Sequence, residues 1–273
     1  MAELSEEVAV ITGAGSGIGR STALLLAELG AKVYVTDVDL KRAESVAGEI
    51  TARGGAAEHR QLDVTDADAV EALASDVFDA EGAVDIVHNN AGVGHAGPVD
   101  ETKLEDWRRV IEVNLMGTIH GVHAFVPRLL RQGRPAHIVN TASMAGLVAS
   151  AELVPYTTSK FAVVGLSEAL NAELAPKGIR VTAICPGIID TPIVRDATYR
   201  GEIAGDAQRV QDFYRRRGAS PDVVAKSVVR ALRRKPVIQP VPYSHVMVPW
   251  LLKRISPRAA QPLARLAPRL PRR

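Results

Sequence analysis

Short apolar runs alternate with longer helical patterns through the N-terminal part of the chain. Val8–Thr12 is a continuous apolar run, typical of a strand buried on both faces, and a helical pattern covers Arg20 to Leu29. The alternation continues with predicted strands at about 32–37, 57–62 and 84–88 and predicted helices at about 40–53 and 66–80. Such an alternation forms a parallel sheet with right-handed crossovers. We therefore predict an α/β fold, a single domain built on a doubly wound, Rossmann-like parallel sheet with helices on both faces.

A glycine-rich turn joins the first predicted strand to the first predicted helix. Glycines allow a tight turn and a close approach to a pyrophosphate, whose charge then lies on the N–H groups of the helix N-terminus. The spacing of Gly13, Gly15, Gly17 and Gly19 departs from the common fingerprint G-x-G-x-x-G. Such a turn can also be only a loop, so its interpretation depends on the rest of the chain.

Asp37 closes the second predicted strand, about twenty residues after the glycine turn. A carboxylate at this place accepts hydrogen bonds from ribose hydroxyls and repels a 2′-phosphate, so it favours NAD over NADP. The alternative is a turn residue that only ends the strand. Lys41 and Arg42 lie nearby and weaken the preference, but we expect both to point to water at the start of a helix.

Polar residues also follow the third and fourth predicted strands. Asp63 follows the third, and Asn89-Asn90-Ala91-Gly92 follows the fourth. In open α/β sheets, ligands bind at the carboxyl ends of the strands. These side chains could contact an adenine, hold a loop that faces the cofactor, or only form turns.

The segment Val154–Lys160 places Tyr156 and Lys160 on one face of a predicted helix. Pro155 suits the first helical position and puts Tyr156 in the first turn. A nearby ammonium and the positive helix end both favour a phenolate, so we expect a lowered Tyr156 pKa and a role in proton transfer. By itself this spacing is a weak signal, because it arises often by chance on solvated helices.

Together these motifs resemble the short-chain dehydrogenase/reductase family, over about residues 5–240. Thr12–Gly19 is similar to its T-G-x-x-x-G-x-G turn, Asn89–Gly92 to its N-N-A-G loop, and Tyr156–Lys160 to its Y-x-x-x-K motif. Ser143, Pro186-Gly187 and Asp63 stand where the family has them, as does Asn114 within a long predicted helix at about 104–130. The resemblance implies an NAD-preferring member with a C-terminal extension.

The resemblance implies a role for each of four catalytic residues. Tyr156 would be the general acid/base, Ser143 would bind and position the substrate oxygen, and Lys160 would lower the tyrosine pKa and hold the nicotinamide ribose. Asn114 would anchor a water molecule beside Lys160. The implied cofactor-binding residues are Gly13, Gly15, Ser16, Gly17, Ile18, Gly19, Asp37, Asp63, Val64, Asn90, Ala91, Gly92, Tyr156, Lys160, Pro186, Gly187, Ile189 and Thr191.

The residues expected around the substrate are mostly apolar, and none offers a fixed charge to a carboxylate or phosphate. We therefore expect a hydrophobic alcohol or ketone, such as a steroid, terpenoid, retinoid or long-chain compound, under a mobile lid at about 190–217. His95 could contact this substrate, although a loop histidine more often faces solvent. The predicted substrate residues are Ser143, His95, Ala145, Leu147, Leu153 and Val154.

These expectations predict an NAD-dependent dehydrogenase that transfers a hydride between NAD(H) and a hydrophobic alcohol or ketone. Two alternatives stay open: an NADPH-dependent carbonyl reductase, and a non-catalytic dinucleotide-binding regulatory or adaptor protein. The complete set of Asn114, Ser143, Tyr156 and Lys160 argues against the second, because a binding module does not need all four. The family likeness also implies a homodimer or homotetramer built on the helices at about 104–130 and 156–175.

Cysteine and histidine usage limits the remaining possibilities. Cys185 is the only cysteine, and the acidic first residues lack the pattern of a signal peptide, so we predict a cytoplasmic protein. Cys185 could be a reactive thiol, but no basic residue adjoins it in the sequence and a buried structural cysteine is expected. The histidines show no metal-ligand spacing, and we expect no metal site.

The net charge of +2 hides an uneven distribution. Residues 1–222 hold all 31 acidic and 21 of the 33 basic residues, whereas residues 223–273 hold the other twelve bases and no acid. We expect a catalytic domain over 1–240 and a basic, proline-rich, amphipathic tail over 241–273. The tail could lie on an anionic membrane surface, or pack on a neighbouring subunit or the chain's own lid. The acidic body argues against a nucleic-acid partner.

Overall fold

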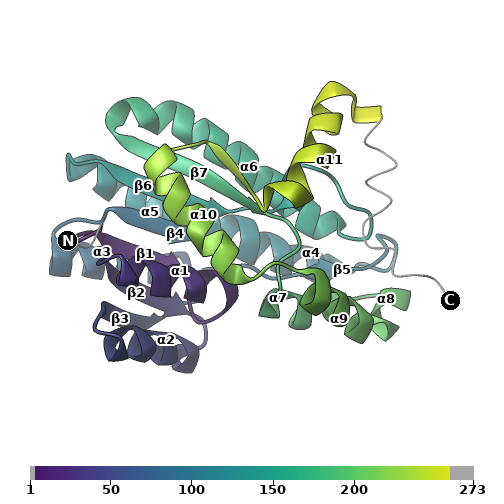
Figure 1. Ribbon diagram of the computed structural model, residues 1–273, viewed down its shortest axis with the longest axis horizontal. Helices are drawn as coiled ribbons and strands as arrows, with labels where there is room; N and C mark the ends of the chain where they lie inside the picture. Colours follow the sequence, from purple (N-terminus) through teal and green to yellow (C-terminus); the bar gives the residue numbers. More distant parts are fainter. Residues whose placement is uncertain (1–3, 259–273) are drawn as a thin grey trace.

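A seven-stranded parallel sheet forms the centre of the protein (Figure 1). The computed structural model describes residues 4–258. The strands pair in the order β3-β2-β1-β4-β6-β7-β9. Their bounds are β1 Val8–Thr12, β2 Lys32–Asp37, β3 Ala56–Gln61, β4 Ile86–Asn89, β6 Ala136–Thr141, β7 Ile179–Pro186 and β9 Ile238–Val241.

Helices cover both faces of this sheet, which confirms the predicted doubly wound fold. One face packs against α1 Gly17–Glu28, α2 Leu40–Ala52 and α10 Pro221–Arg234. The other face packs against α3 Ala67–Glu81, α5 Gly117–Arg131 and α6 Val154–Leu174. Successive side chains of β1 supply both cores, since Val10 belongs to the second and Ile11 to the first.

The strand order reverses between β1 and β4, and this reversal positions the site. From β1 the chain proceeds outward through β2 and β3, then returns to pair β4 with the opposite edge of β1. The two crossover helices therefore lie on opposite faces, and a crevice opens at the carboxyl ends of β1 and β4. Thr12 and Asn89 end these two strands, directly before the glycine turn and the Asn90-Ala91-Gly92 loop.

The helix predicted over 104–130 is confirmed, and it contains a π-helical turn. α4 Leu104–Ile111 is followed by a π-helical turn, η1 Glu112–Met116, and then by α5. Asn114 lies within η1 and is fully buried. π-helical turns inside helices are frequent at functional sites, and this one brings an amide side chain into the interior.

The C-terminal half adds short elements beyond the sheet. Four of them form the covering segment, residues 190–217: α7 Pro192–Arg195, β8 Thr198–Tyr199, α8 Glu202–Gly205 and α9 Ala207–Arg217. β8 pairs with β5 His95–Ala96 in a separate two-stranded sheet. Two 3-10 turns, η2 Met144–Gly146 and η3 Ala175–Lys177, flank α6.

The tail expected after residue 240 begins with a helix that contacts the body of the protein. α11 Tyr243–Ile255 follows β9 directly, and Val246 is fully buried in a core cluster with Leu147 and Val163. Residues 259–273 of the predicted tail lie outside the described residues. No helix within residues 4–258 combines the length and apolar content that a membrane crossing requires.

Candidate active site

A cavity of about 790 Å³ opens at the carboxyl ends of the central strands. It reaches from Asp37, at the end of β2, past the glycine turn and Tyr156 to the covering segment. Sixteen of the predicted cofactor residues line it: Gly13, Ser16, Gly17, Ile18, Asp37, Asp63, Val64, Asn90, Ala91, Gly92, Tyr156, Lys160, Pro186, Gly187, Ile189 and Thr191. Gly15 and Gly19 lie in the same turn without lining the cavity.

The glycine turn has the shape that a bound phosphate group requires. Gly13 and Gly17 have φ angles of +61° and +51°, which residues other than glycine rarely adopt. A Cβ atom at Gly13 would also lie 2.8 Å from the Cα of Ala91. The Ser16 side chain does not cap α1, and the first turn of α1 holds no acidic residue. The first N–H groups of α1 can therefore bind an anion, which fits the pyrophosphate of a dinucleotide.

Asp37 is fixed at the far end of the cavity by two backbone donors. Its Oδ2 accepts a hydrogen bond from Gly15 N at 2.9 Å, and its Oδ1 accepts one from Asp39 N at 3.0 Å. Arg42 also lines this end, and its Nε lies 3.3 Å from Asp39 Oδ2. A buried carboxylate and a half-exposed guanidinium thus stand at the same end of the cavity.

Asn90 connects three strand ends. Its Nδ2 donates to the carbonyl oxygens of Thr12 and Gly13 at 3.0 and 3.1 Å, and its Oδ1 accepts from the Thr141 hydroxyl at 3.2 Å. The Thr12 hydroxyl in turn accepts from the backbone N–H of Asn90 at 3.0 Å. Of the roles considered for this asparagine, the structure supports holding the loop that faces the cavity.

Tyr156, Lys160 and Ser143 come together in the cavity wall. Pro155 occupies the start of α6 as predicted, so Tyr156 lies in its first turn. Lys160, one turn later, is 2% exposed, and its Nζ lies 5.7 Å from the centre of the tyrosine ring. Ser143 follows β6 and lines the same cavity, and its hydroxyl favours the ionised form of the phenol.

The expected lowering of the Tyr156 pKa is wrong for this structure. Burial raises the pKa of Tyr156 to about 12, although the Ser143 hydroxyl opposes the rise. Burial also lowers the pKa of Lys160 to about 8. The Lys160 ammonium donates to Thr141 O at 2.8 Å, away from the phenol, so the cost of desolvation outweighs its attraction for a phenolate.

Asn114 supports the site from behind and does not line the cavity. Its Oδ1 accepts from Val93 N at 2.8 Å, and its Nδ2 donates to Val93 O at 3.1 Å and to Ser159 Oγ at 3.2 Å. A Cβ atom at Gly92 would lie 3.2 Å from Asn114 Oδ1 and 3.6 Å from Lys160 Nζ. Asn114 thus ties the Gly92–Val93 loop to α6, beside the lysine.

The other end of the cavity is mostly apolar, as predicted, but the expected absence of charged residues is wrong, because Arg109, Glu152 and Asp196 also line it. The other lining residues also differ in part from those expected. Ser143, His95, Ala145 and Leu153 line it, whereas Leu147 packs in the core beneath and Val154 does not line it. Sequence reasoning missed further lining residues on the covering segment and α11, which include Tyr199, Phe213, Tyr214, His245 and Pro249. The adjacent aromatic residues Phe213 and Tyr214, in an otherwise polar helix, were a usable signal for α9.

His95 is buried, which excludes the solvent-facing position considered more frequent for it. The residue is 2% exposed, and neither ring nitrogen has a hydrogen-bond partner. Its Nε2 lies 3.8 Å from Asp106 Oδ2, and burial lowers the pKa of His95. His95 therefore lines the cavity with its ring next to a buried carboxylate.

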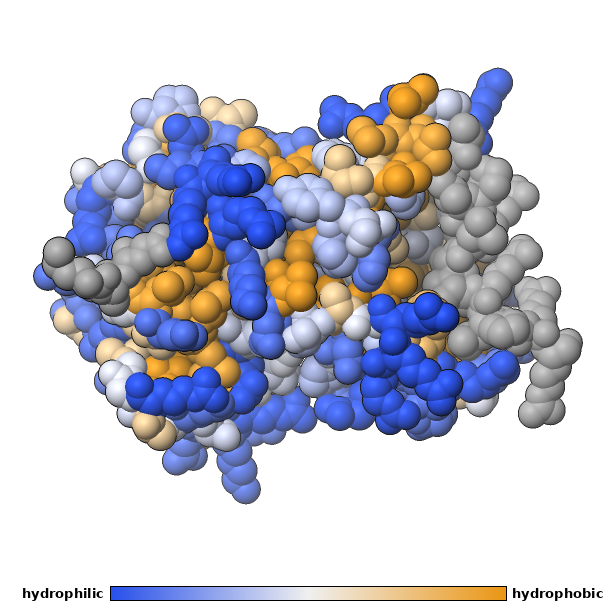
Figure 2. Space-filling model, in the orientation of Figure 1, coloured by the Kyte–Doolittle hydropathy of each residue, from blue (hydrophilic) through white to orange (hydrophobic). Residues whose placement is uncertain are grey.

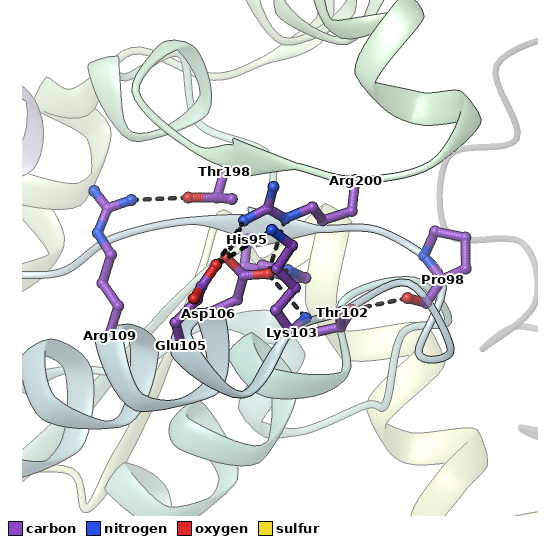
Figure 3. A network of polar contacts seen from close by, with 9 residues as sticks. All are labelled: His95, Pro98, Thr102, Lys103, Glu105, Asp106, Arg109, Thr198 and Arg200. Atoms are coloured by element: carbon purple, nitrogen blue, oxygen red, sulfur yellow. Dashed lines mark hydrogen bonds and ion pairs between the residues drawn. The ribbon is translucent and has the colours of Figure 1, made fainter.

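A polar network beside His95 fastens the covering segment to α4 (Figure 3). Arg200 follows β8 and donates from Nε and Nη2 to the two carboxylate oxygens of Asp106, at 2.9 and 2.7 Å. This pairing holds the pKa of Asp106 below its ordinary value. Arg109 donates to the Thr198 hydroxyl at 2.8 Å. Together with the β5–β8 pairing, these contacts fix the middle of the covering segment.

α11 contributes to the cavity wall, which its place in the predicted tail did not suggest. His245 and Pro249 line the cavity, and a Cβ atom at Gly187 would lie 2.7 Å from the Cβ of His245. Lys253 donates to Leu147 O at 2.7 Å and lies 4.0 Å from the centre of the Phe161 ring. This helix is therefore part of the site.

Cys185 and the histidines have structural environments in the described part of the chain. Cys185 is fully buried, and burial raises its pKa to about 12, so it is not a reactive thiolate. His120 bonds through Nδ1 to Val64 O at 2.9 Å. Residues 4–258 contain no group of three or more His, Cys, Asp or Glu side chains placed to hold a metal ion.

Comparisons with known proteins match the whole of this architecture. The family model for short chain dehydrogenases matches residues 7–200. The chain is 42% identical over 263 residues to the probable oxidoreductase EphD of Mycobacterium tuberculosis, covering 94% of this chain and 44% of that protein. The chain thus spans less than half the length of this relative.

Two shorter relatives are similar over most of their own length. The chain is 43% identical over 205 residues to the 1-deoxy-11-beta-hydroxypentalenate dehydrogenase of Streptomyces exfoliatus, with 74% of each protein covered. It is 42% identical over 195 residues to the cyclohexanol dehydrogenase of an Acinetobacter species, with 71% of this chain and 77% of that protein covered.

Solved structures agree with this assignment. A short-chain dehydrogenase/reductase from Burkholderia phymatum in complex with NAD superposes with a TM-score of 0.87 at 32% identity, covering 97% of both chains. A metagenomic short-chain oxidoreductase in complex with NADP has a TM-score of 0.71 at 33% identity, covering 88% of this chain and 96% of that one. The motifs, the fold and these matches together place the chain in the short-chain dehydrogenase/reductase family.

Proposed function

We propose that the protein is an NAD-dependent dehydrogenase that oxidises hydrophobic alcohols reversibly to the corresponding carbonyl compounds. The main support is the meeting of Ser143, Tyr156 and Lys160 in the wall of one cavity. The glycine turn and Asp37 lie at one end of this cavity, and apolar residues lie at the other. A dinucleotide and an apolar substrate can therefore meet beside the phenol.

In this proposal Tyr156 is the general acid/base, and Ser143 binds and orients the substrate oxygen. With a pKa raised to about 12, Tyr156 carries its proton at neutral pH and is a ready proton donor to a ketone. In the oxidative direction it must first lose that proton, which the positive charge of Lys160 assists. Asn114 is a positioning residue, because it holds the Gly92–Val93 loop against α6.

The cofactor would be held by residues at the ends of four strands and by Lys160 of α6. The N-terminus of α1 would bind the pyrophosphate, Asp37 the adenosine ribose, Asp63 and Val64 the adenine side, and Lys160 the nicotinamide ribose. Pro186, Gly187, Ile189 and Thr191 would face the nicotinamide. When bound, the nicotinamide carries the hydride, and its oxidised ring adds a positive charge beside the phenol.

Asp37 supports NAD over NADP in this proposal. A 2′-phosphate next to its buried carboxylate would meet a like charge at short range. Arg42 is the residue that favours the rival reading, an NADPH-dependent reductase, because a guanidinium at the same end of the cavity can bind a phosphate. Its pairing with Asp39 partly neutralises it, so we expect the carboxylate to dominate.

The apolar end of the cavity supports a hydrophobic substrate. Val148, Ile193, Val194 and Phe213 line it, and the Tyr199 hydroxyl is already bonded to Val194 O at 2.6 Å. The names of two relatives, a hydroxypentalenate dehydrogenase and a cyclohexanol dehydrogenase, agree with a cyclic or terpenoid-like secondary alcohol. A mostly apolar pocket wall favours such ligands because their apolar surface is buried on binding.

Replacing Tyr156 tests the catalytic part of the proposal. Tyr156→Phe should lower kcat for alcohol-dependent NADH formation by at least about a hundredfold, because general acid/base catalysis contributes on this order. NAD binding, measured by calorimetry, should stay unchanged. Tyr34→Phe is the matched control, since this hydroxyl bonds to Glu81 outside the cavity. Retained turnover in Tyr156→Phe would remove the tyrosine from the mechanism.

The alternative to an enzyme is a non-catalytic protein that only binds a dinucleotide. It would bind NAD with Asp37 and the glycine turn but would oxidise no alcohol in a broad hydrophobic panel. The same assays, with NADH absorbance as the readout, separate it from the dehydrogenase.

By family likeness we also propose that the protein forms a homodimer or homotetramer. Light scattering of the purified protein measures this oligomeric state directly.

A further inference from the structure

α11 has two apolar faces, and only one of them is used by the described part of the chain. The inner face buries Val246 and places Pro249 at the cavity. The outer face carries large aliphatic side chains at i, i+3, i+4 and i+7, which is the spacing of one continuous stripe on a helix. This outer stripe consists of Val248, Leu251, Leu252 and Ile255, with exposed fractions of 65%, 47%, 40% and 83%.

The outer stripe is visible as an orange cluster over α11, at the upper right of Figure 2. No other helix of residues 4–258 exposes four large aliphatic side chains in this pattern. Contiguous apolar surface of this kind marks a place where a protein meets another surface.

α10 supplies positive charge on the same side of the molecule. Figures 1 and 2 place α10 and α11 on the face toward the viewer, with hydrophilic side chains over α10. The exposed bases are Lys226, Arg230, Arg233, Arg234 and Lys235. Four of them, together with Leu25, Leu29 and Val229, line a shallow hollow between α1 and α10. The last turn of α11 adds the exposed Arg254, and the chain has no acidic residue after Asp222.

We propose that α10 and the outer stripe of α11 form a docking surface for a phospholipid bilayer that contains anionic lipids. A bilayer satisfies both parts of this surface at once. Its interfacial acyl region takes up an aliphatic stripe that lies parallel to the membrane, and its headgroups attract the bases. Burying the stripe removes apolar area from water, whereas the bases give a salt-sensitive attraction.

Docking in this orientation brings the cavity wall to the membrane. The helix that carries the outer stripe also carries His245 and Pro249, which line the cavity. If the substrate is hydrophobic, it partitions into the bilayer, next to the helix that closes the cavity. This last step rests on the proposed function, whereas bilayer binding itself needs neither cofactor nor turnover.

Co-sedimentation of the full chain with vesicles tests the docking surface. We expect the protein to pellet with vesicles of phosphatidylcholine mixed with phosphatidylglycerol, to pellet weakly with phosphatidylcholine alone, and to lose binding as salt rises. Val248→Ser/Leu251→Ser/Leu252→Ser should weaken binding at least about tenfold, since three aliphatic side chains no longer leave water. Leu40→Ser/Val99→Ser is the control, because these exposed residues lie outside α10, α11 and the helices expected to form the oligomer contact.

Two further variants keep the test decisive. Arg230→Gln/Arg234→Gln should weaken binding to anionic vesicles without changing the outer stripe. This variant tests the docking surface even if circular dichroism shows that the triple serine variant does not fold. Tyr156→Phe should bind vesicles like the unaltered protein, so that a failed dehydrogenase assay and a failed docking assay stay distinguishable. Retention of the unaltered protein in the supernatant, or equal binding by the triple serine and control variants, would overturn the proposal. It would also be overturned if the serine variant only dissociated an oligomer, because the stripe would then be a contact between copies of the chain.

Discussion

Asp37 is the residue on which the choice of cofactor depends. Gly15 N and Asp39 N donate to its two oxygens, so the carboxylate is held in a fixed orientation at the edge of the cavity. Arg42 stands at the same end but is paired with Asp39. The balance between one fixed anion and one partly neutralised cation therefore sets the preference for a ribose hydroxyl or a phosphate.

Removing the Asp37 carboxylate should change the two cofactor affinities in opposite directions. Asp37→Ala should weaken NADH binding on the order of tenfold, because a charge-assisted hydrogen bond is lost, and should strengthen NADPH binding by removing repulsion. Fluorescence titration with both cofactors measures this. Asp66→Asn is the control, since it removes an acidic charge outside the cavity and keeps the side-chain oxygen that caps α3. An unchanged ratio of the two affinities in Asp37→Ala would assign the preference to another residue.

At the scale of elements, the covering segment is fixed in its middle and framed by short helices. β8 pairs with β5, and Arg200 spans both oxygens of Asp106, which is 5% exposed. Phe213 and Tyr214 on α9 and Val194 on α7 reach the cavity from either side of this fixed point. The position of the apolar wall thus depends in part on the ion pair between Arg200 and the buried Asp106.

Breaking this ion pair should affect substrate binding more than chemistry. Arg200→Ala leaves the Asp106 carboxylate buried without its main partner, so the segment is held less firmly. We expect KM for the alcohol to rise on the order of tenfold, a loss of about 1.4 kcal/mol, with a smaller change in kcat. Arg200→Lys should restore part of the loss. Arg195→Ala, which removes an exposed arginine of the same segment, should behave like the unaltered protein, and equal effects of both alanine variants would contradict this role.

The order of strands and helices could be predicted because a local sequence pattern indicates each of these elements. A continuous apolar run predicted the bounds of β1, a short β-branched run predicted those of β2, and Pro155 marked the start of α6. The π-helical turn at Asn114 had no such local signal, since it depends on hydrogen bonds to Val93 in a distant loop. The place of α11 depends on tertiary packing of Val246 and Lys253, which composition does not reveal.

In the site, too, residues that belong to local sequence motifs could be predicted, whereas features that depend on contacts between distant residues could not. The glycine turn, Asp37, Tyr156 and Lys160 were found because their chemistry fixes their spacing, and Ser143 was found through the family resemblance. The pKa of Tyr156 was predicted with the wrong sign, because the sequence shows that Lys160 is near but not that its ammonium bonds to Thr141 O. Likewise, nothing local in the sequence places His245 at the cavity.

At the scale of the whole molecule, two buried histidines tie stability to pH. His88 on β4 and His137 on β6 bond through Nε2 to the hydroxyls of Thr141 and Thr182, each at 2.8 Å. Burial lowers the pKa of His88 to about 3 and that of His137 to about 4, from an ordinary value of 6.5. Between pH 6.5 and 4 the unfolded chain therefore binds protons that the folded protein does not, and stability falls as pH falls.

The free energy of unfolding should accordingly drop by about 2 to 4 kcal/mol between pH 7 and pH 5, a window above the usual titration of carboxylates. Urea denaturation at both pH values measures the difference. His137→Gln, which keeps a side-chain donor for Thr182, should remove about half of the pH dependence. Equal stability at pH 7 and pH 5 would show that neither histidine is held neutral by the fold.

The central claim is that hydride passes between an apolar alcohol and NAD beside Tyr156. Its most direct test is to incubate the protein with NAD and secondary alcohols deuterated at the carbinol carbon, beginning with cyclohexanol, and to analyse the reduced cofactor by mass spectrometry. The account predicts NADH that carries the deuterium with the unaltered protein and no product with Tyr156→Phe. Unlabelled NADH, label transfer that survives in Tyr156→Phe, or no transfer from any hydrophobic alcohol would contradict it.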